Sequence, residues 1–189
     1  DTFIFSDGAK LPGDFNSVAG RAGTDTLDYS AYSTSVEVYL QGGRATGTTG
    51  GVSSIENVVG SVQAGNTIHG DDGDNVLVSG STDDTLVGYG GDDTYVFDTD
   101  GPLGSDILDE QTGGSGNDTL DFSGSLTLAV VIDLSTKAVQ IVNANLTLTL
   151  LGTLENLIGG QKDDILIGNA QANRITGGLG DDTLNGGTG

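Results

Sequence analysis

Residues 177–185 read Gly-Gly-Leu-Gly-Asp-Asp-Thr-Leu-Asn, and residues 113–121 read Gly-Gly-Ser-Gly-Asn-Asp-Thr-Leu-Asp. Both fit a nine-residue pattern, G-G-x-G-x-D-x-U-x, in which U is a large apolar residue. The same period continues elsewhere, because an Asp or Asn precedes each short Thr/Val/Ile-plus-apolar pair at intervals of nine residues. These positions are Asn66, Asn75, Asp84 and Asp93 in the first half and Asp164, Asn173 and Asp182 in the second. A fixed period of this kind predicts a solenoid, in which each repeat is one segment of a coil.

The composition is acidic, rich in glycine and poor in apolar residues. Glycine accounts for 33 of the 189 residues, hydrophobic residues for 35%, and 27 acidic against 6 basic residues give a net charge of −21. Such a chain resembles a disordered linker, but a low-complexity sequence would not keep the nine-residue phase over four consecutive repeats. The charge argues against nucleic acid and against anionic membranes or polysaccharides as partners. It favours cations.

Cysteine use and hydropathy bear on the expected compartment. The chain has no cysteine, which excludes a disulfide framework and a thiolate metal site and suits a protein secreted without disulfides. Its most apolar run, residues 146–158, is broken by Thr, Gly, Glu and Asn, so we expect no membrane insertion. Residues 1–5 read as the end of a repeat and 186–189 as the start of another, so we expect the sequence to belong to a longer protein.

A larger duplication covers the nonapeptides and divides the chain into residues 1–92 and 93–189. Three segments recur in the same order in both copies: residues 1–5 match 93–97, residues 25–30 match 118–123, and residues 54–60 match 153–159. Each copy therefore has one isolated nonapeptide, an excursion, and a block of consecutive nonapeptides. We expect two tandem copies of one fold, or one continuous solenoid that contains both.

The segments between the repeats predict strands and loops but no helix. Val36, Val38 and Leu40 alternate with more polar residues, and residues 146–150 alternate leucine with threonine, so both excursions predict strands. The connections at residues 6–20 and 98–112 contain the two prolines, and we expect them to be surface loops.

Each repeat predicts six residues of turn followed by three of strand, with the U side chain pointing inward and its neighbours outward. Successive strands run across and back, so a full coil takes eighteen residues and residue n stacks on residue n+18. This spacing pairs Asn66 with Asp84, Asn75 with Asp93, and Asp164 with Asp182. The inward residues predict a narrow core of Ile68, Leu77, Leu86, Tyr95, Leu120, Leu166, Ile175 and Leu184.

The stacked turns predict calcium sites. Coils lie about 4.8 Å apart and calcium–oxygen bonds are about 2.3–2.6 Å, so an ion between two turns can bond to both. The aspartate supplies charge, carbonyl oxygens complete the shell, and glycine permits the positive φ that the turn needs. Oxygen ligands without a Cys/His cluster favour several Ca²⁺ ions over zinc. The expected metal-binding residues are Asp25, Asn66, Asn75, Asp84, Asp93, Asp118, Asp164, Asn173 and Asp182, with Gly70, Gly73, Gly88, Gly91, Gly159, Gly177 and Gly180.

The nonapeptides resemble the RTX (hemolysin-type) calcium-binding repeats of secreted bacterial proteins. The order Asp-Thr-Leu-Asp-Phe/Tyr-Ser, excursion, Ile/Leu-Glu-Asn-Val/Leu, nonapeptides is similar to the C-terminal β-roll region of serralysin-type metalloproteases. The resemblance implies an all-β, right-handed parallel β-roll with calcium in its Gly/Asp-rich turns, folding outside the cell or at its surface, and export by a type I secretion system. It implies no catalytic activity for these residues.

Three functions fit this sequence. The chain is a calcium-binding module that stabilises its parent, a non-catalytic C-terminal part of a secreted protease, lipase or epimerase, or a segment of an adhesin or surface-layer protein. No H-E-x-x-H or G-x-S-x-G motif occurs, so we expect no enzymatic activity here.

Three further details complete the expected site. His69, the one histidine, is expected to have a structural role facing solvent, and Glu56 and Glu155 are expected to form a polar ladder or to cap turns and not to act in catalysis. Asp164–Asp182 carries carboxylates at both positions of a consecutive pair, so we expect it to bind calcium most tightly.

Overall fold

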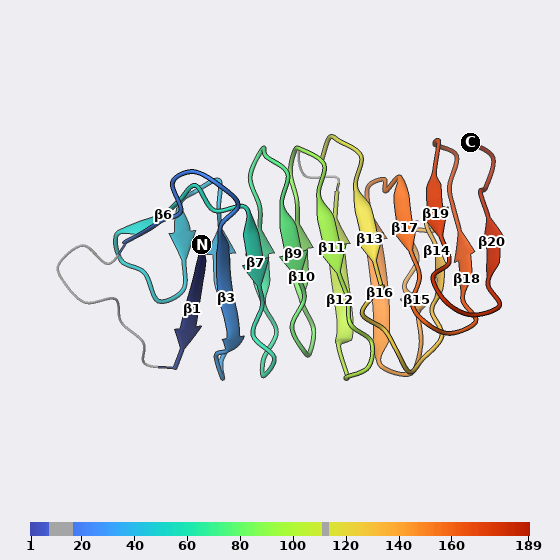
Figure 1. The fold of residues 1–189 in the computed structure, drawn as a ribbon, viewed down its shortest axis with the longest axis horizontal. Coiled ribbons are helices and arrows are strands. Elements are labelled where there is room, and N and C mark those ends of the chain that lie inside the picture. Colours follow the sequence, from blue (N-terminus) through green and yellow to red (C-terminus); the bar gives the residue numbers. More distant parts are fainter. Residues whose placement is uncertain (8–16, 111–113) are drawn as a thin grey trace.

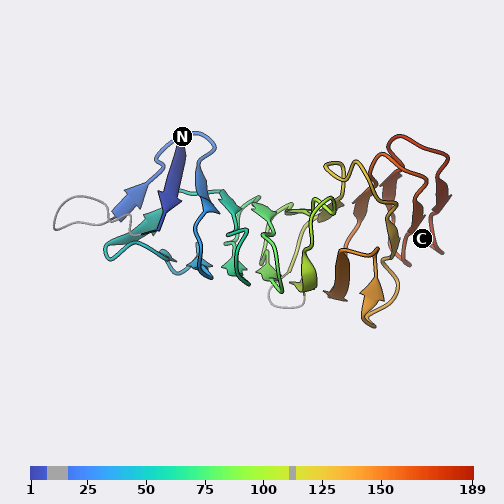
Figure 2. The same ribbon diagram turned by 90° about the horizontal axis from the view of Figure 1, so that it is seen from below.

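The structure is a computed structural model that describes residues 1–7, 17–110 and 114–189. These residues form twenty strands and no helix. Figure 1 shows the strands standing side by side along the long axis, with the chain progressing from the blue end to the red end. The view turned by 90° in Figure 2 shows a long, thin molecule. No helix of the described residues is long and apolar enough to span a membrane.

The first long sheet contains every second strand of the solenoid. Its neighbours all pair in parallel, as expected when the chain returns to the same side after each coil. It crosses the boundary between the two sequence copies, because β9 pairs with β11. In spatial order the strands are β1 (Thr2–Ser6), β3 (Thr26–Ala31), β7 (Asn57–Val59), β9 (Val76–Val78), β11 (Thr94–Val96), β13 (Thr119–Asp121), β17 (Asn156–Ile158) and β19 (Arg174–Thr176).

The intervening strands form the remaining sheets. One sheet has seven strands, in the order β15 (Gln140–Ile141), β16 (Leu146–Leu151), β12 (Gly104–Asp109), β10 (Thr85–Val87), β8 (Thr67–His69), β4 (Glu37–Tyr39) and β5 (Arg44–Ala45). A second has three, β14 (Val131–Asp133), β18 (Ile165–Ile167) and β20 (Thr183–Asn185), and β2 (Ser17–Ala19) pairs with β6 (Gly51–Ser53). Among the described strands, only β4–β5 and β15–β16 pair antiparallel.

The strand register confirms the eighteen-residue coil within the blocks of nonapeptides. Thr67 lies opposite Thr85, Val76 opposite Thr94, and Ile165 opposite Thr183. Where an excursion intervenes the partners are further apart in sequence, as between Thr94 and Thr119. The fold is the predicted parallel β-roll.

Most three-residue strands contribute one inward side chain to the core, and longer strands contribute more, such as β16 with Leu146, Leu148 and Leu150. Ile68, Leu77, Leu86, Tyr95, Leu120 and Leu166 are all 0% exposed, as predicted. The predicted core is wrong at the last coil: Ile175 is only partly buried and Leu184 is 49% exposed, because no further described coil covers them. The predicted excursion strands are present as β4 and β16, in which buried residues alternate with less buried ones.

The prediction of a surface loop at residues 98–112 is wrong for six of its fifteen residues. Residues 104–109 form β12, which pairs with β10 and β16 and buries Leu108 completely. In the other predicted loop, residues 17–19 form β2. Residues 8–16 of that loop and residues 111–113, which include the first glycine of one nonapeptide, lie outside the described residues.

Candidate metal centre

The predicted metal-binding side chains lie in columns, one residue before the strand of each coil. The strand register places them on neighbouring coils. Asn173, Asp182, Glu56 and Glu155 are half-buried, and the others are buried. The first column contains Asp25, Glu56, Asn75, Asp93, Asp118, Glu155 and Asn173; the second contains Asn66, Asp84 and Asp106; the third contains Asp164 and Asp182.

A repeated hydrogen bond connects each column. In most steps the backbone N–H of one coil donates to the side-chain oxygen of the next coil toward the C-terminus; between Glu56 and Asn75, and between Glu155 and Asn173, the asparagine Nδ2 instead donates to the glutamate backbone carbonyl. In the first column Asn75 N–H donates to Asp93 Oδ1 (2.8 Å) and Asp93 N–H donates to Asp118 Oδ1 (3.0 Å). Asp164 N–H donates to Asp182 Oδ1 at 3.0 Å in the third column. The carboxylates therefore hold adjacent coils together even before an ion is considered.

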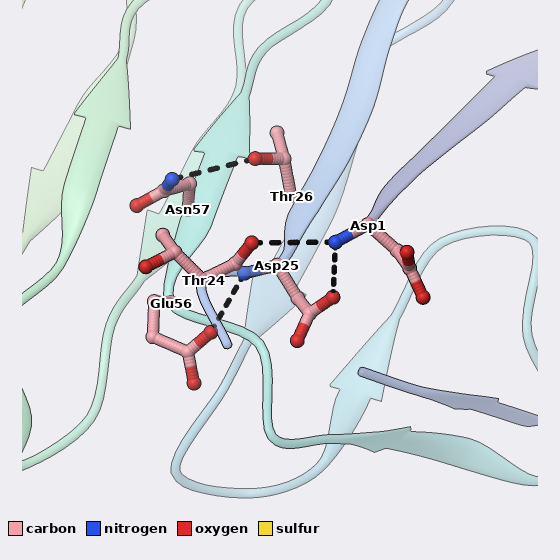
Figure 3. A network of polar contacts seen from close by, with 6 residues as sticks. All are labelled: Asp1, Thr24, Asp25, Thr26, Glu56 and Asn57. Carbon is pink, nitrogen blue, oxygen red and sulfur yellow. Dashed lines mark hydrogen bonds and ion pairs between the residues drawn. The ribbon is translucent and has the colours of Figure 1, made fainter. Parts of the chain in front are cut away.

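Glu56 and Glu155 make the same connection in the two copies, which agrees with the capping role expected for them. Asp25 N–H donates to Glu56 Oε2 (2.9 Å), and Asp118 N–H donates to Glu155 Oε2 (2.9 Å). Figure 3 shows the first of these contacts, with the amino group of Asp1 donating to Asp25 Oδ1 at 2.5 Å. The glutamate carboxylate therefore accepts a hydrogen bond from the backbone N–H of the preceding coil, as the aspartate does in the nonapeptides.

The first glycine of each turn makes room for the side chain five residues later. A Cβ atom at Gly88 would lie 2.1 Å from Asp93 Oδ2, much closer than any real contact. A substitution there would push the carboxylate out of the turn. Gly70, Gly159 and Gly177 have the same relation to Asn75, Asp164 and Asp182.

The fourth position of the turn has a different requirement at Gly91 and Gly180, which Gly73 does not share because it has no positive φ. Gly91 has φ of 100°, which side chains rarely adopt, and a Cβ there would lie 2.5 Å from the carbonyl carbon of Gly73 in the stacked turn. Gly180 has φ of 121° and the same close approach to Lys162. Thr82 takes φ of 75° in place of this glycine, so a departure from the repeat is tolerated there with the turn conformation kept.

Several carboxylate oxygens in these columns are buried with no hydrogen-bond partner, namely Asp25 Oδ2, Asp93 Oδ2, Asp106 Oδ2 and Glu110 Oε2. A buried anionic oxygen without a partner is unfavourable, because its lost hydration is not replaced. Among the described residues, Asp93, Glu110 and Asp118 form a group whose oxygens lie within 4.8 Å of one another. Oxygen-only ligands of high charge suit a hard divalent cation, so the residues present fit calcium.

Comparison with known protein families agrees with this geometry. The family described as RTX calcium-binding nonapeptide repeat (four copies) matches residues 63–98, 112–124 and 158–189. The chain contains RTX calcium-binding repeats. No curated protein matches it. The matched segments include the predicted ligands from Asn66 to Asp93 and from Asp164 to Asp182, as well as Asp118.

Burial raises the pKa of several carboxyl groups in and beside the RTX columns. Desolvation is the largest cause, and neighbouring carboxylates add to it: the pKa is about 9 at Glu110, about 8 at Asp106 and about 7 at Asp93. At Asp118 the backbone N–H of Asp93 opposes desolvation, and the pKa is about 6. Without a cation, Glu110 and Asp106 hold protons at neutral pH. A bound metal ion takes the place of those protons, so binding releases them.

Two acidic residues of these turns were missing from the expected metal-binding set. Asp106 lies in the second column, where its Oδ1 accepts the Asp84 N–H at 2.8 Å. A signal for it exists, because residues 104–109 read G-S-D-I-L-D and match the last six positions of the nonapeptide. The other is Glu110, which directly follows. No nonapeptide position predicts a glutamate there.

His69 lies on the outer surface of β8, as its place after the inward Ile68 predicts. Its Nδ1 is 2.9 Å from the hydroxyl of Tyr89, and its ring packs against Tyr39 and Tyr89. These contacts support the structural role expected for it.

Proposed function

We propose that this chain is a calcium-binding β-roll module in which the carboxylates of the three columns hold several Ca²⁺ ions between stacked turns. The observation that carries this proposal is the set of buried carboxylate oxygens without partners, in a chain of net charge −21 with only six basic residues. Amide oxygens at Asn66, Asn75 and Asn173 still offer ligands but contribute no charge. Calcium neutralises the columns, and the turn backbone supplies further oxygens.

Calcium binding also controls folding. Carboxylates on adjacent coils repel by about 1 kcal/mol per pair in water and by more where they are shielded. A core one residue thick per sheet stabilises too little to outweigh that repulsion and the loss of chain entropy. The fold therefore depends on metal binding. Extracellular calcium modules bind with dissociation constants of about 10⁻⁴–10⁻³ M, so the chain stays unfolded in a low-calcium cytosol and folds after secretion, through a type I system by resemblance.

The module contributes structure to its parent protein and no catalytic group. One histidine, no cysteine and no nucleophile motif are available in the sequence, so a nucleophile–base pair of the usual kinds cannot be assembled. Any activity of the parent resides in other residues. The expected benefit is a parent protein that becomes rigid and protease-resistant only where calcium is abundant.

The test is far-UV circular dichroism of the chain in chelator and then in a few millimolar Ca²⁺. We expect a mostly unfolded spectrum in chelator and a β spectrum with calcium, and Mg²⁺ at the same concentration serves as the control for ionic strength. A β spectrum that is unchanged by the chelator contradicts calcium-dependent folding. The absence of calcium uptake in calorimetry contradicts the proposed function itself.

A further inference from the structure

Glu110 occupies a position at which the RTX repeat has glycine. The register pairs His69 with Val87 and Val87 with Asp109, so Glu110 stacks in line with Gly70 and Gly88, the first glycines of their turns. Its backbone makes the same connection as theirs, since Glu110 N–H donates to Leu151 O (2.6 Å) and Gly70 N–H donates to Val87 O (2.8 Å). A carboxyl side chain thus stands at a position where the repeat has no side chain.

The loop that follows Glu110 is longer than the ordinary turn. Residues 110–118 connect β12 to β13, whereas the six residues 88–93 connect β10 to β11. A Cβ atom at Gly114 would lie 2.5 Å from Glu110 Oε2, so a glycine stands against the glutamate carboxylate. The absence of a side chain at Gly114 therefore leaves room for the Glu110 carboxylate.

The Glu110 carboxylate points into the RTX column. Its Oε1 accepts a hydrogen bond from the Tyr95 hydroxyl, and its Oε2 is buried without a partner, as is Asp93 Oδ2. Glu110 is 6% exposed, Asp93 1% and Asp118 3%. The charges that act on Glu110 belong to Asp118, Asp93 and Glu155, all carboxylates. A buried group of like charges with free oxygens requires a cation or protons.

The oxygens are close enough to share one cation, because the three carboxylates offer oxygens within 4.8 Å of one another. Calcium accepts six to eight oxygen ligands in flexible geometry at about 2.3–2.6 Å, which suits an irregular group of carboxylates. Magnesium requires shorter bonds, about 2.0–2.1 Å, and near-ideal octahedral geometry. We propose that Glu110 is a third carboxylate ligand in a calcium site formed with Asp93 and Asp118, at a repeat position that normally holds glycine. This inference rests on the proposed calcium-binding function and adds a ligand that the repeat motif does not contain.

The direct test is calorimetric titration with Ca²⁺ of the wild type, Glu110→Gln and Glu37→Gln. The amide of Glu110→Gln keeps the size of the side chain and can still accept the Tyr95 bond, so a purely structural role would survive. We expect its tightest calcium-binding step to weaken about 10-fold or more, because ligand charge tunes calcium affinity. Glu37 is exposed on β4, so Glu37→Gln controls for the loss of one net charge and should bind like the wild type.

A Glu110→Gln chain that binds calcium as tightly as the wild type overturns this inference and leaves the proposed function standing. A wild type that takes up no calcium overturns both. If Glu110→Gln does not reach the wild-type β spectrum in saturating calcium, Glu110→Gly decides the question. That change restores the residue of the repeat and removes the carboxylate, and unchanged affinity in it overturns the inference as well.

A second measurement leaves Glu110 intact. Tb³⁺ replaces Ca²⁺ in oxygen sites and emits when a nearby tyrosine is excited, and the chain has five tyrosines and no tryptophan. Tyr95 is fully buried against Glu110, so Tyr95→Phe should abolish most of the emission from the first ion bound. Tyr39→Phe, on the outer surface, should retain it. Equal emission from Tyr95→Phe and the wild type contradicts a site at Glu110.

Discussion

The turns around Asp93 and Asp118 and the turns around Asp164 and Asp182 depart from the RTX repeat in opposite ways. The C-terminal turns include a complete nonapeptide at residues 177–185, yet Asp182 is only half-buried. The central turns contain a glutamate in place of a glycine and a longer connection, yet they bury three carboxylates within 4.8 Å. Agreement of a segment with the repeat motif therefore indicates the geometry of its coil. The strength of a cation site depends on how many charges the coils bury together.

This difference changes the ranking of the sites. The sequence places Asp164–Asp182 first, because this pair of consecutive nonapeptides has a carboxylate at both positions. We now expect the site of Asp93, Glu110 and Asp118 to bind calcium most tightly, since it has one more carboxylate and lower exposure. The following predictions test the contrast between the centre and the C-terminal end.

The largest effect is expected from pH in the absence of calcium. The folded-state pKa values of Asp118, Asp93 and Glu110 are about 6, 7 and 9, all raised mainly by burial, whereas the unfolded chain loses these protons near pH 4. A raised carboxyl pKa stabilises the folded chain fully below pH 4, and this stabilisation is lost as the pH rises through 6 to 9. In chelator, the central coils should therefore gain structure as the pH falls from 9 toward 5.

Amide hydrogen exchange in chelator at pH 5.5 and 8.5, corrected for intrinsic rates, measures this region by region. The coils of β9 to β13 should gain more protection at the lower pH than those of β18 to β20. Calcium affinity should change in the reverse sense, because calcium competes with protons for the same oxygens. Greater protection of the central coils at pH 8.5 would contradict the assigned pKa shifts.

Core truncations should separate the same two regions. Leu120→Ala removes a fully buried side chain beside the central site and should lower the free energy of unfolding in saturating calcium by about 2–5 kcal/mol. Leu184 is 49% exposed on the last coil, so Leu184→Ala should lower the free energy of unfolding by less than about 0.5 kcal/mol. Urea denaturation of both variants gives the comparison, and equal losses would show that the last coil is covered in solution.

Charge removal should give the smallest of these differences. Asp118→Asn keeps an oxygen that can accept the Asp93 N–H bond and removes one charge of the central site, so the tightest calcium step should weaken about 10-fold. Asp182→Asn changes a half-buried residue and should affect a weaker step by a smaller factor. Calorimetric titration of both decides the ranking. A larger loss for Asp182→Asn would restore the order that the repeat alone indicates.

The nine-residue period predicts most of the fold, because it states both which side chains point inward and which turns stack. Leu77, Leu86 and their equivalents are buried where the period places them, and Asp93 lies above Asn75 as the eighteen-residue coil requires. The structural role of Glu56 and Glu155 could be predicted because they occupy equivalent positions in the two copies.

The remaining features depend on contacts that the period does not describe. β12 was missed because only part of a nonapeptide marks it, and its other edge is covered by β16, more than forty residues away in sequence. Glu110 was missed for a related reason: its importance comes from the register with Gly88 and from Asp118 across the turn, and neither is visible until β12 is known to be a strand. Leu184 is exposed because β20 lies at the edge of its sheet, and the local sequence pattern contains no information about which strand is at the edge.

The hydrogen bonds made by the aspartates of the columns share one direction, and this gives the roll a growth polarity. The aspartate of the later coil accepts the N–H of the earlier one, as from Asn75 to Asp93 and from Asp93 to Asp118. A coil added on the N-terminal side of a folded stretch finds its acceptor already in place, whereas a coil added on the C-terminal side must bring the acceptor with it. The two ends of a growing roll are thus inequivalent, as in a polar filament. A chain delivered with its C-terminus first would assemble onto waiting carboxylates, one coil at a time.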